Sequence, residues 1–264
     1  MYKAKNRSLA IAGIKMDYIT FGVGKRPLIL IPGLSTSRIK GKALVMSYAY
    51  RIFAKNFQCY VFDRKDKITS GYSITDMAEE LALAIRVLGL HKVDVVGVSQ
   101  GGMIAQSLAI SHPNLINRLV LGVTTAVANE TVQATIGGWI SLAKEQDSKQ
   151  LLLDMTEKIY TDHYQNRHRF LLWLSSQFLK TKEWERFEIL ASSILDFDVR
   201  KKLSQISCPV FVIGGKQDKV VGENSSQDLA DRLGAECYLY DNIGHSAYLE
   251  ADDFNKRICQ FLLV

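Results

Sequence analysis

Short apolar runs alternate with longer amphipathic runs over most of this 264-residue chain, and this alternation constrains its fold most strongly. Most of the apolar runs are rich in Val, Ile and Leu, as strands are when helices cover both faces of their sheet. Strands separated by helices imply a mostly parallel sheet with right-handed crossovers. We predict eight strands, at residues 9–14, 16–21, 28–31, 59–62, 93–98, 119–123, 210–213 and 237–240.

The segments between these strands carry the predicted helices, which cover both faces of the sheet. They fall at residues 40–54, 75–88, 100–111, 225–233 and 252–262. The helix at 75–88 has a start signal, Ser73 three residues before Asp76, and a stop signal at Gly89. The first two strands are joined too tightly for a crossover, so we expect an antiparallel hairpin at one edge of the sheet.

Residues 126–195 interrupt the alternation with helical periodicity, many aromatic residues and no convincing strand. A crossover needs only a dozen or so residues. We therefore predict a helical cap insertion at 126–195 and an α/β core formed by residues 1–125 and 196–264. Trp139, Trp173 and Phe178 are the candidate substrate-binding residues of this cap. The alternative is that the aromatic face only packs on the core.

The predicted strand at 93–98 runs directly into the hexapeptide Gly-Val-Ser-Gln-Gly-Gly and then into an apolar helix. This is the G-x-S-x-G pattern in a strand–turn–helix setting. Glycines are needed because the tight turn strains the central residue, and side chains two positions away would collide. The pattern predicts Ser99 as a nucleophile at the carboxyl edge of the sheet, beside a helix N-terminus that favours negative charge.

A serine hydroxyl is a poor nucleophile at neutral pH and needs a base to accept its proton. Of the five histidines, only His245 follows a predicted strand at the edge where Ser99 emerges. The others lie at the wrong end of a strand, about three helical turns past the nucleophile, or in the insertion; they are His91, His112, His163 and His168. We therefore predict His245 as the general base.

Asp218 is the candidate acid that orients this histidine. It follows the strand at 210–213 after a short Gly-containing loop, from which a carboxylate can reach the second imidazole nitrogen and fix its tautomer. Asp241, close to His245 in sequence, and Asp198, at the end of the insertion, are the alternatives.

At these residues the chain resembles the α/β-hydrolase superfamily, and the resemblance extends over nearly its whole length. The segment VDVVGVSQGGMIAQSLAISHP is similar to single-domain esterases, enol-lactonases and cofactor-free haloperoxidases of that group. The order nucleophile, acid, histidine is matched by Ser99, Asp218 and His245. The resemblance implies the α/β-hydrolase fold. It also implies an oxyanion hole in which the backbone N–H of Leu34 joins that of Gln100.

Serine at position 99 favours acyl transfer, whereas an aspartate there would indicate a dehalogenase or an epoxide hydrolase. We expect hydrolysis of a small or medium carboxylic ester through an acyl-enzyme, with no cofactor. A lactonase, thioesterase, C–C bond hydrolase or perhydrolase would use the same triad, and a ligand receptor of this fold is a further alternative. Zinc-ligand spacing of His, Cys, Asp or Glu is not found, so we expect no metal.

The partner that we expect is a small-molecule, ester-like substrate, and composition argues against other classes of partner. The net charge is +6, but basic residues are scattered among acids apart from the run at 200–202, so we expect no nucleic-acid partner. No stretch approaches the roughly 20 apolar residues of a membrane span, and the N-terminal apolar run is too short for a secretory signal. Four cysteines without C-x-x-C spacing predict free thiols, which favour a cytoplasmic location.

Overall fold

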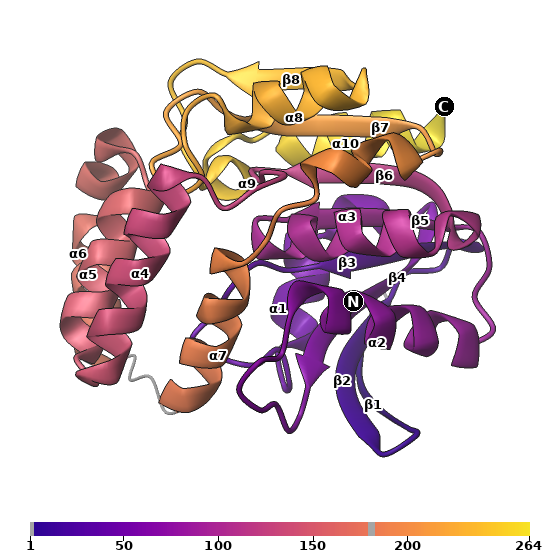
Figure 1. Cartoon of the computed structure of the whole chain (residues 1–264), viewed down its shortest axis with the longest axis horizontal. Coiled ribbons are helices and arrows are strands. Elements are labelled where there is room, and N and C mark those ends of the chain that lie inside the picture. Colours follow the sequence, from indigo (N-terminus) through magenta and orange to yellow (C-terminus); the bar gives the residue numbers. More distant parts are fainter. Residues whose placement is uncertain (1–2, 179–182) are drawn as a thin grey trace.

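The computed structural model describes residues 3–178 and 183–264 (Figure 1). Within them, eight strands form one sheet in the order β1-β2-β4-β3-β5-β6-β7-β8. The β1–β2 and β2–β4 pairs are antiparallel, and every other neighbouring pair is parallel. The strands are β1 Lys5–Ile11, β2 Ile14–Phe21, β3 Arg26–Ile31, β4 Phe57–Lys65, β5 Val93–Val98, β6 Ile116–Gly122, β7 Val210–Gly215 and β8 Glu236–Tyr240.

Helices cover both faces of this sheet, and each face has its own hydrophobic cluster. One cluster joins the sheet to α2, α3 and α8, and the other joins it to α1, α9 and α10. All six residues of β5 are buried, five of them Val or Gly and one, Asp94, charged. The core helices are α1 Ala43–Ala49, α2 Ile74–Val87, α3 Gln100–Ser111, α8 Ser225–Leu233, α9 Ala247–Glu250 and α10 Phe254–Leu263.

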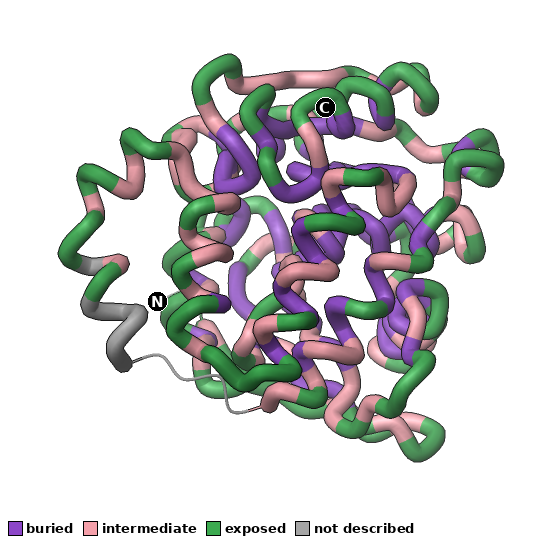
Figure 2. The backbone as a smooth tube through the Cα atoms, turned by 60° about the vertical axis from the view of Figure 1, so that its left-hand side comes forward, coloured by how far each residue is buried: buried purple, intermediate pink, exposed green. Residues whose placement is uncertain are grey.

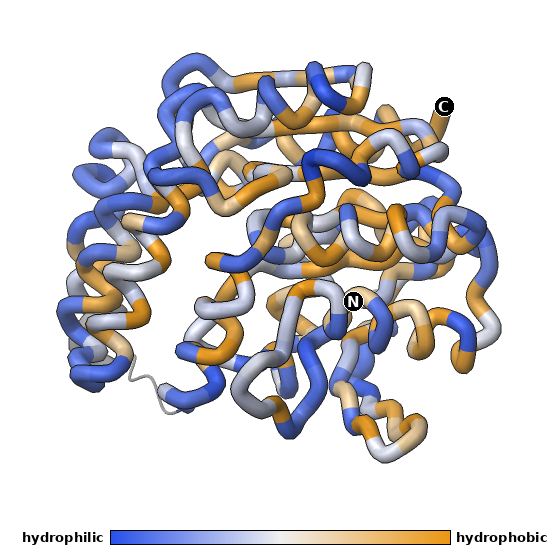
Figure 3. The backbone as a smooth tube through the Cα atoms, in the orientation of Figure 1, coloured by the Kyte–Doolittle hydropathy of each residue, from blue (hydrophilic) through white to orange (hydrophobic). Residues whose placement is uncertain are grey.

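Burial and hydropathy follow this layered arrangement. Figure 2 shows buried backbone concentrated in the sheet and in the helices against it. Figure 3 shows apolar residues along the strands and hydrophilic residues on the outer loops and helix faces. The predicted helix start is confirmed, because Ser73 and Asp76 form a reciprocal capping box at the first turn of α2.

The predicted bounds of the edge hairpin and of the helix at 40–54 are wrong. The edge hairpin turns at Ala12 and Gly13, both with positive φ, so Ile14 begins β2 and does not end β1. The Ala-Gly pair lacks the usual Asn-Gly or Asp-Gly signal, so the sequence does not mark this turn. The helix expected at 40–54 is shorter, since Gly41 adopts a φ of +82° and a separate 3-10 turn forms at Arg51–Phe53.

The segment between β6 and β7 is helical, as predicted. Its helices lie beyond the carboxyl ends of the strands, at the left of Figure 1, and are α4 Glu130–Lys144, α5 Ser148–Ile159, α6 Asp162–Phe178 and α7 Trp184–Leu195. None of the described side chains of α6 is buried, and this helix projects outward in Figure 2. The division into a core and a cap at residues 126 and 195 stays a prediction.

All four cysteines are free thiols. Cys59 and Cys259 are buried, whereas Cys208 and Cys237 are partly exposed. No helix in the described part of the chain is both long and apolar enough to span a membrane.

Candidate active site

The turn between β5 and α3 holds Ser99 in a strained conformation, with φ +55° and ψ −123°. The neighbouring positions must be glycine, because other backbone atoms lie where a side chain would begin. A Cβ on Gly97 would lie 2.4 Å from the carbonyl oxygen of Gly101, and one on Gly101 would lie 2.0 Å from that of Ile31. The turn therefore allows the backbones of β3, β5 and α3 to approach closely and raises Ser99 above the sheet edge.

The neighbouring strand β6 supports this turn from one side. The Ser99 N–H donates to the Gly122 carbonyl at 2.9 Å, and the Thr124 hydroxyl donates to the Ser99 carbonyl at 2.8 Å. Because both backbone groups of Ser99 are held, the side chain has a defined direction. A Cβ on Gly102 would collide with Thr124 at 2.6 Å, so glycine is needed there as well.

Two loops bring the predicted partners to Ser99. His245 lies between β8 and α9, and its Nε2 is 3.0 Å from the Ser99 Oγ. Its Nδ1 is 2.8 Å from the Asp218 Oδ2. Both His245 and Asp218 are buried, at 4% and 2% exposed. This geometry assigns a tautomer in which Nδ1–H donates to Asp218 and Nε2 accepts the serine proton.

Backbone donors fix the carboxylate of Asp218 from its other side. Its Oδ1 accepts hydrogen bonds from the N–H groups of Val220 and Val221, each at 2.9 Å. The alternative acids are placed elsewhere. Asp241 is exposed and pairs with Lys216 at 2.7 Å. Asp198 pairs with an adjacent arginine, whose hydrogen bond lowers the pKa of this carboxyl to about 2.

The loop of residues 32–39, named the oxyanion loop below, follows β3 and passes over the turn. Gly33 lies so close that a Cβ on it would be 3.1 Å from the Cβ of Ser99. Leu34 is the next residue of this loop. Gln100 is the first residue of α3, so its N–H has no acceptor within the helix. Both segments that carry the predicted oxyanion donors thus flank Ser99.

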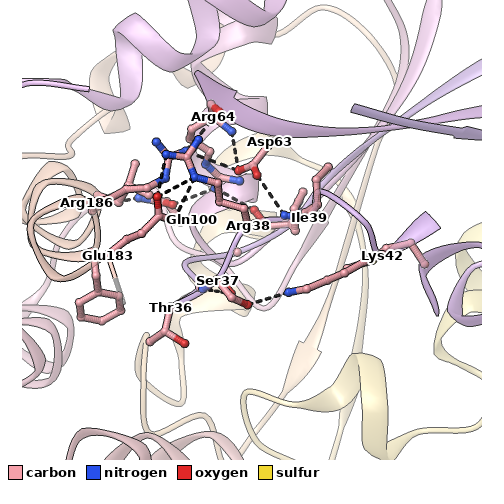
Figure 4. Close-up of a pocket in the computed structure, with 16 residues that line it drawn as sticks. Thr36, Ser37, Arg38, Ile39, Lys42, Asp63, Arg64, Gln100, Glu183 and Arg186 are labelled. Atoms are coloured by element: carbon pink, nitrogen blue, oxygen red, sulfur yellow. Dashed lines mark hydrogen bonds and ion pairs between the residues drawn. The ribbon is translucent and has the colours of Figure 1, made fainter. Parts of the chain in front are cut away.

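A cavity of about 80 Å³ lies beside this centre, between the oxyanion loop and α7. Gly33 and Gln100 contribute to its wall, and α7 contributes Arg186, Phe187 and Leu190. Figure 4 shows its charged side chains, which come from the oxyanion loop, from the start of α1, from the end of β4 and from the start of α7. Among the described residues, no group of three or more His, Cys, Asp or Glu side chains is arranged to hold a metal ion.

The profile of the family described as alpha/beta hydrolase fold matches residues 26–252. The chain belongs to the α/β-hydrolase fold family. The mostly parallel eight-stranded sheet with helices on both faces, described above, is that of this fold. The fold predicted from the sequence is therefore confirmed.

The chain is similar to several known proteins over most of its length. The chain is 24% identical to 3-oxoadipate enol-lactonase 2 of Acinetobacter baylyi, over 86% of this chain and 84% of that protein. It is 25% identical to 2-hydroxy-6-oxononadienedioate/2-hydroxy-6-oxononatrienedioate hydrolase 2 of Pseudomonas putida, over 94% and 92%. The crystal structure of an enol-lactonase from Burkholderia xenovorans superimposes with a TM-score of 0.85 at 21% identity, covering 98% and 100% of the two chains.

Two of the three predicted substrate-binding aromatics of this α/β hydrolase, Trp139 and Trp173, are not brought to the cavity. Trp139 is buried within the inserted helices, and its indole N–H donates to Asp154 at 2.7 Å. Trp173 is 56% exposed on α6, with Phe170 at 6.1 Å between ring centroids. The side chain of Phe178 lies outside the described residues. Contact of these three residues with substrate stays a prediction.

Sequence reasoning missed the charged residues around the cavity of this hydrolase. Asp63 and Arg64 come directly after the apolar run at 59–62, near the carboxyl end of β4. The rule that singled out Asp218, a charged residue where a buried strand reaches its carboxyl end, would have found both. Arg186 gave no comparable signal, because an arginine on an amphipathic helix is ordinarily a solvated one.

Proposed function

We propose that this chain is a serine hydrolase that cleaves small or medium carboxylic esters through an acyl-enzyme. The observation that carries the proposal is the buried chain of contacts from Asp218 to His245 to Ser99, at 2.8 and 3.0 Å. Membership of the α/β-hydrolase fold family supports it. The ordered backbone around Ser99 supports a nucleophile that is oriented before substrate binds.

In the proposed reaction, His245 Nε2 accepts the hydroxyl proton while Ser99 Oγ bonds to the ester carbonyl carbon. The carbonyl oxygen then carries a negative charge, which the N–H groups of Gln100 and Leu34 stabilise. The bond to the alcohol oxygen breaks as His245 returns the proton to it. Water repeats the sequence on the acyl-enzyme and releases the acid, and Asp218 stabilises the charged imidazole in both halves.

The size of the cavity supports a short acyl group. Its volume of about 80 Å³ and its mixed polar and apolar wall leave little room for a long aliphatic chain. Phe187 and Leu190 close its apolar side, and both are buried. Ser99 and His245 do not line this cavity, but Gly33 and Gln100, which flank Ser99, belong to its wall. We therefore place the acyl part of the ester here.

A lactonase is the second candidate, because relatives in both sequence and structure are named enol-lactonases. A lactone is a cyclic ester, so the same nucleophile, base and oxyanion donors would open it. The two activities can be distinguished by their products. An open-chain ester gives a separate acid and alcohol, whereas a lactone gives one molecule in which the alcohol stays attached to the acyl group.

The test is a series of 4-nitrophenyl esters from acetate to dodecanoate, with simple and enol lactones measured in parallel. We expect Ser99-dependent turnover that is highest for the short acyl chains and falls as the chain lengthens. Ser99→Ala is the matched control, because it removes only one oxygen atom. Equal turnover by Ser99→Ala, or no turnover of any ester or lactone by the wild type, would reject the proposal.

A further inference from the structure

The buried guanidinium of Arg64 on β4 lies between the two segments that carry the proposed oxyanion donors. Its Nη2 donates to the Pro32 carbonyl and to the side-chain Oε1 of Gln100, in both cases at 2.8 Å. Arg64 is 6% exposed and Gln100 is fully buried, so bulk water does not compete for these bonds. One side chain therefore holds the oxyanion loop and the start of α3 together.

The bond to Pro32 controls the direction of the oxyanion loop. Because the peptide unit is planar, fixing the Pro32 carbonyl fixes the plane that leads to Gly33. The following peptide unit carries the Leu34 N–H. The loop contains no helix or strand that would hold it in another way. A small rotation at Pro32 would therefore move the donor relative to Ser99.

The other end of the oxyanion loop is held by the residue before Arg64. Asp63 accepts from the Ile39 N–H at 3.0 Å through one carboxylate oxygen, and from the Arg64 N–H at 2.8 Å through the other. Arg38 of the loop binds Glu183, with its Nε 2.8 Å from Oε1 (Figure 4). That hydrogen bond lowers the pKa of Glu183, so the pair is charged at neutral pH.

The side-chain amide of Gln100 is fixed from both sides. Its Nε2 donates to the Leu190 carbonyl at 2.6 Å and to the Ser193 hydroxyl at 3.2 Å, both on α7. Arg186 of the same helix donates to the Arg64 carbonyl at 3.2 Å. The amide therefore presents its oxygen to Arg64 and cannot turn without breaking the contact with α7.

The burial of Arg64 carries an energetic cost. Its Nε has no hydrogen-bond partner among the described residues, and an unpaired buried donor is unfavourable. Burial also lowers the pKa of the Arg64 guanidinium to about 10, which still leaves it charged at neutral pH. A charged side chain held at such a cost between two donor segments indicates a role in the site.

We propose that Arg64, acting through Pro32 and the Gln100 side chain, is a positioning residue that sets the distance between the two oxyanion donors. This inference rests on the proposed function, which gives those donors their role. Arg64 belongs to the wall of the cavity but touches no reacting atom. Its removal should therefore weaken stabilisation of the negative charge on the carbonyl oxygen more than it weakens substrate binding.

The test compares Arg64→Met, Arg64→Lys and Gln100→Met with the wild type. The first readout is kcat and KM for a short ester. The second is inhibition by a trifluoromethyl ketone, which Ser99 attacks to give a hemiketal whose charged oxygen occupies the oxyanion hole. Arg26→Met is the matched control, because Arg26 donates to the Leu262 carbonyl and to the buried Asp94 near the opposite end of the sheet.

Removing one oxyanion donor typically lowers the rate about 10²–10³-fold, and displacing one should cost less. We expect Arg64→Met to lose about 10- to 100-fold in kcat, with KM changed less than threefold. Affinity for the trifluoromethyl ketone should fall in proportion to kcat. The kcat of Arg64→Lys should lie between those of Arg64→Met and the wild type. The lysine ammonium keeps the charge but cannot donate two hydrogen bonds in the planar geometry of a guanidinium. Arg26→Met should lower the melting temperature and leave kcat within twofold.

A folded Arg64→Met enzyme with near-normal kcat and ketone inhibition would overturn the inference. So would a loss that appears in KM alone, or equally in Arg26→Met, because either would indicate a merely structural role. If Arg64→Met does not fold, Gln100→Met decides on the same criteria. A wild type without Ser99-dependent turnover would instead reject the proposed function, so the two failures are distinguishable.

Discussion

At the scale of single residues, the Asp218 carboxylate is held by three donors that leave it one arrangement. Two backbone N–H groups contact Oδ1, and the His245 Nδ1 contacts Oδ2. An asparagine could keep its oxygen toward the backbone donors. Its NH₂ would then face the imidazole and demand an acceptor at Nδ1. The imidazole would change tautomer and present a proton, in place of a lone pair, to Ser99.

We therefore expect Asp218→Asn to fold normally and to lose on the order of 10³–10⁴ in kcat. Melting temperature and steady-state kinetics measured on the same preparation check this. Asp241→Asn is the control, because Asp241 is exposed and paired only with Lys216, and it should keep wild-type kcat. If Asp241→Asn strongly lowers kcat while Asp218→Asn keeps normal kcat, then Asp241 and not Asp218 orients His245.

The glycines differ sharply in what a methyl group would meet. A Cβ on Gly101 would lie 2.0 Å from the Ile31 carbonyl oxygen, whereas one on Gly137, inside α4, would meet nothing within 4 Å. We expect Gly101→Ala to destabilise the protein by more than about 2 kcal/mol and to abolish turnover. Gly137→Ala should stabilise it by about 0.5–1 kcal/mol. Denaturant unfolding of both variants measures the contrast, and equal effects would contradict it.

At the scale of elements, α7 contributes more to the site than the other inserted helices. Arg186, Phe187 and Leu190 line the cavity, and the Leu190 carbonyl accepts from Gln100. The helices before α7 contact the loops that hold Asp218 and His245. Thr135 donates to the Lys219 carbonyl at 3.4 Å, and the Ile159 carbonyl accepts from the Ser246 N–H at 3.0 Å.

Shortening Leu190 should therefore change which esters are preferred. Leu190→Ala keeps the backbone carbonyl that binds Gln100 and enlarges the cavity beside it. We expect the preferred acyl chain in the ester series to become longer. Each added carbon that the enlarged cavity accepts should raise kcat/KM severalfold, since a buried methylene contributes about 0.8 kcal/mol. Trp173→Ala on the exposed side of α6 should leave the profile unchanged. If the preferred chain length changes only in Trp173→Ala, then Trp173 selects the substrate and Leu190 does not.

The sequence predicted the strands of the sheet and its edge hairpin better than it predicted which inserted residues face the cavity. Apolar runs and turn glycines are local signals, so β5, α3 and the position of Ser99 follow from them. Contact between α7 and β4 is a long-range event, since Arg186 and the carbonyl of Lys65 are 121 residues apart. Trp139 satisfied the aromatic pattern but binds Asp154 of its own insertion, which no local periodicity distinguishes from a pocket position.

At the scale of the whole molecule, two separate hydrophobic clusters stabilise the sheet from its two faces, and no disulfide joins the four cysteines. Stability should then be independent of redox conditions. We expect thiol titration in denaturant to give four reactive thiols and the melting temperature to be the same with and without dithiothreitol. Two missing thiols, or a fall in melting temperature on reduction, would contradict the assignment of free cysteines.

The central claim, that Ser99 forms an acyl-enzyme, is tested most directly by mass spectrometry of the protein and of its peptides. The protein is mixed with a short 4-nitrophenyl ester, quenched in acid within the first turnover and digested to locate the added mass. We predict one acyl group per chain on the peptide that contains Ser99. It should decay on longer incubation and be absent from Ser99→Ala. Turnover without any acyl adduct in the wild type, or an adduct that persists in Ser99→Ala, would contradict the account.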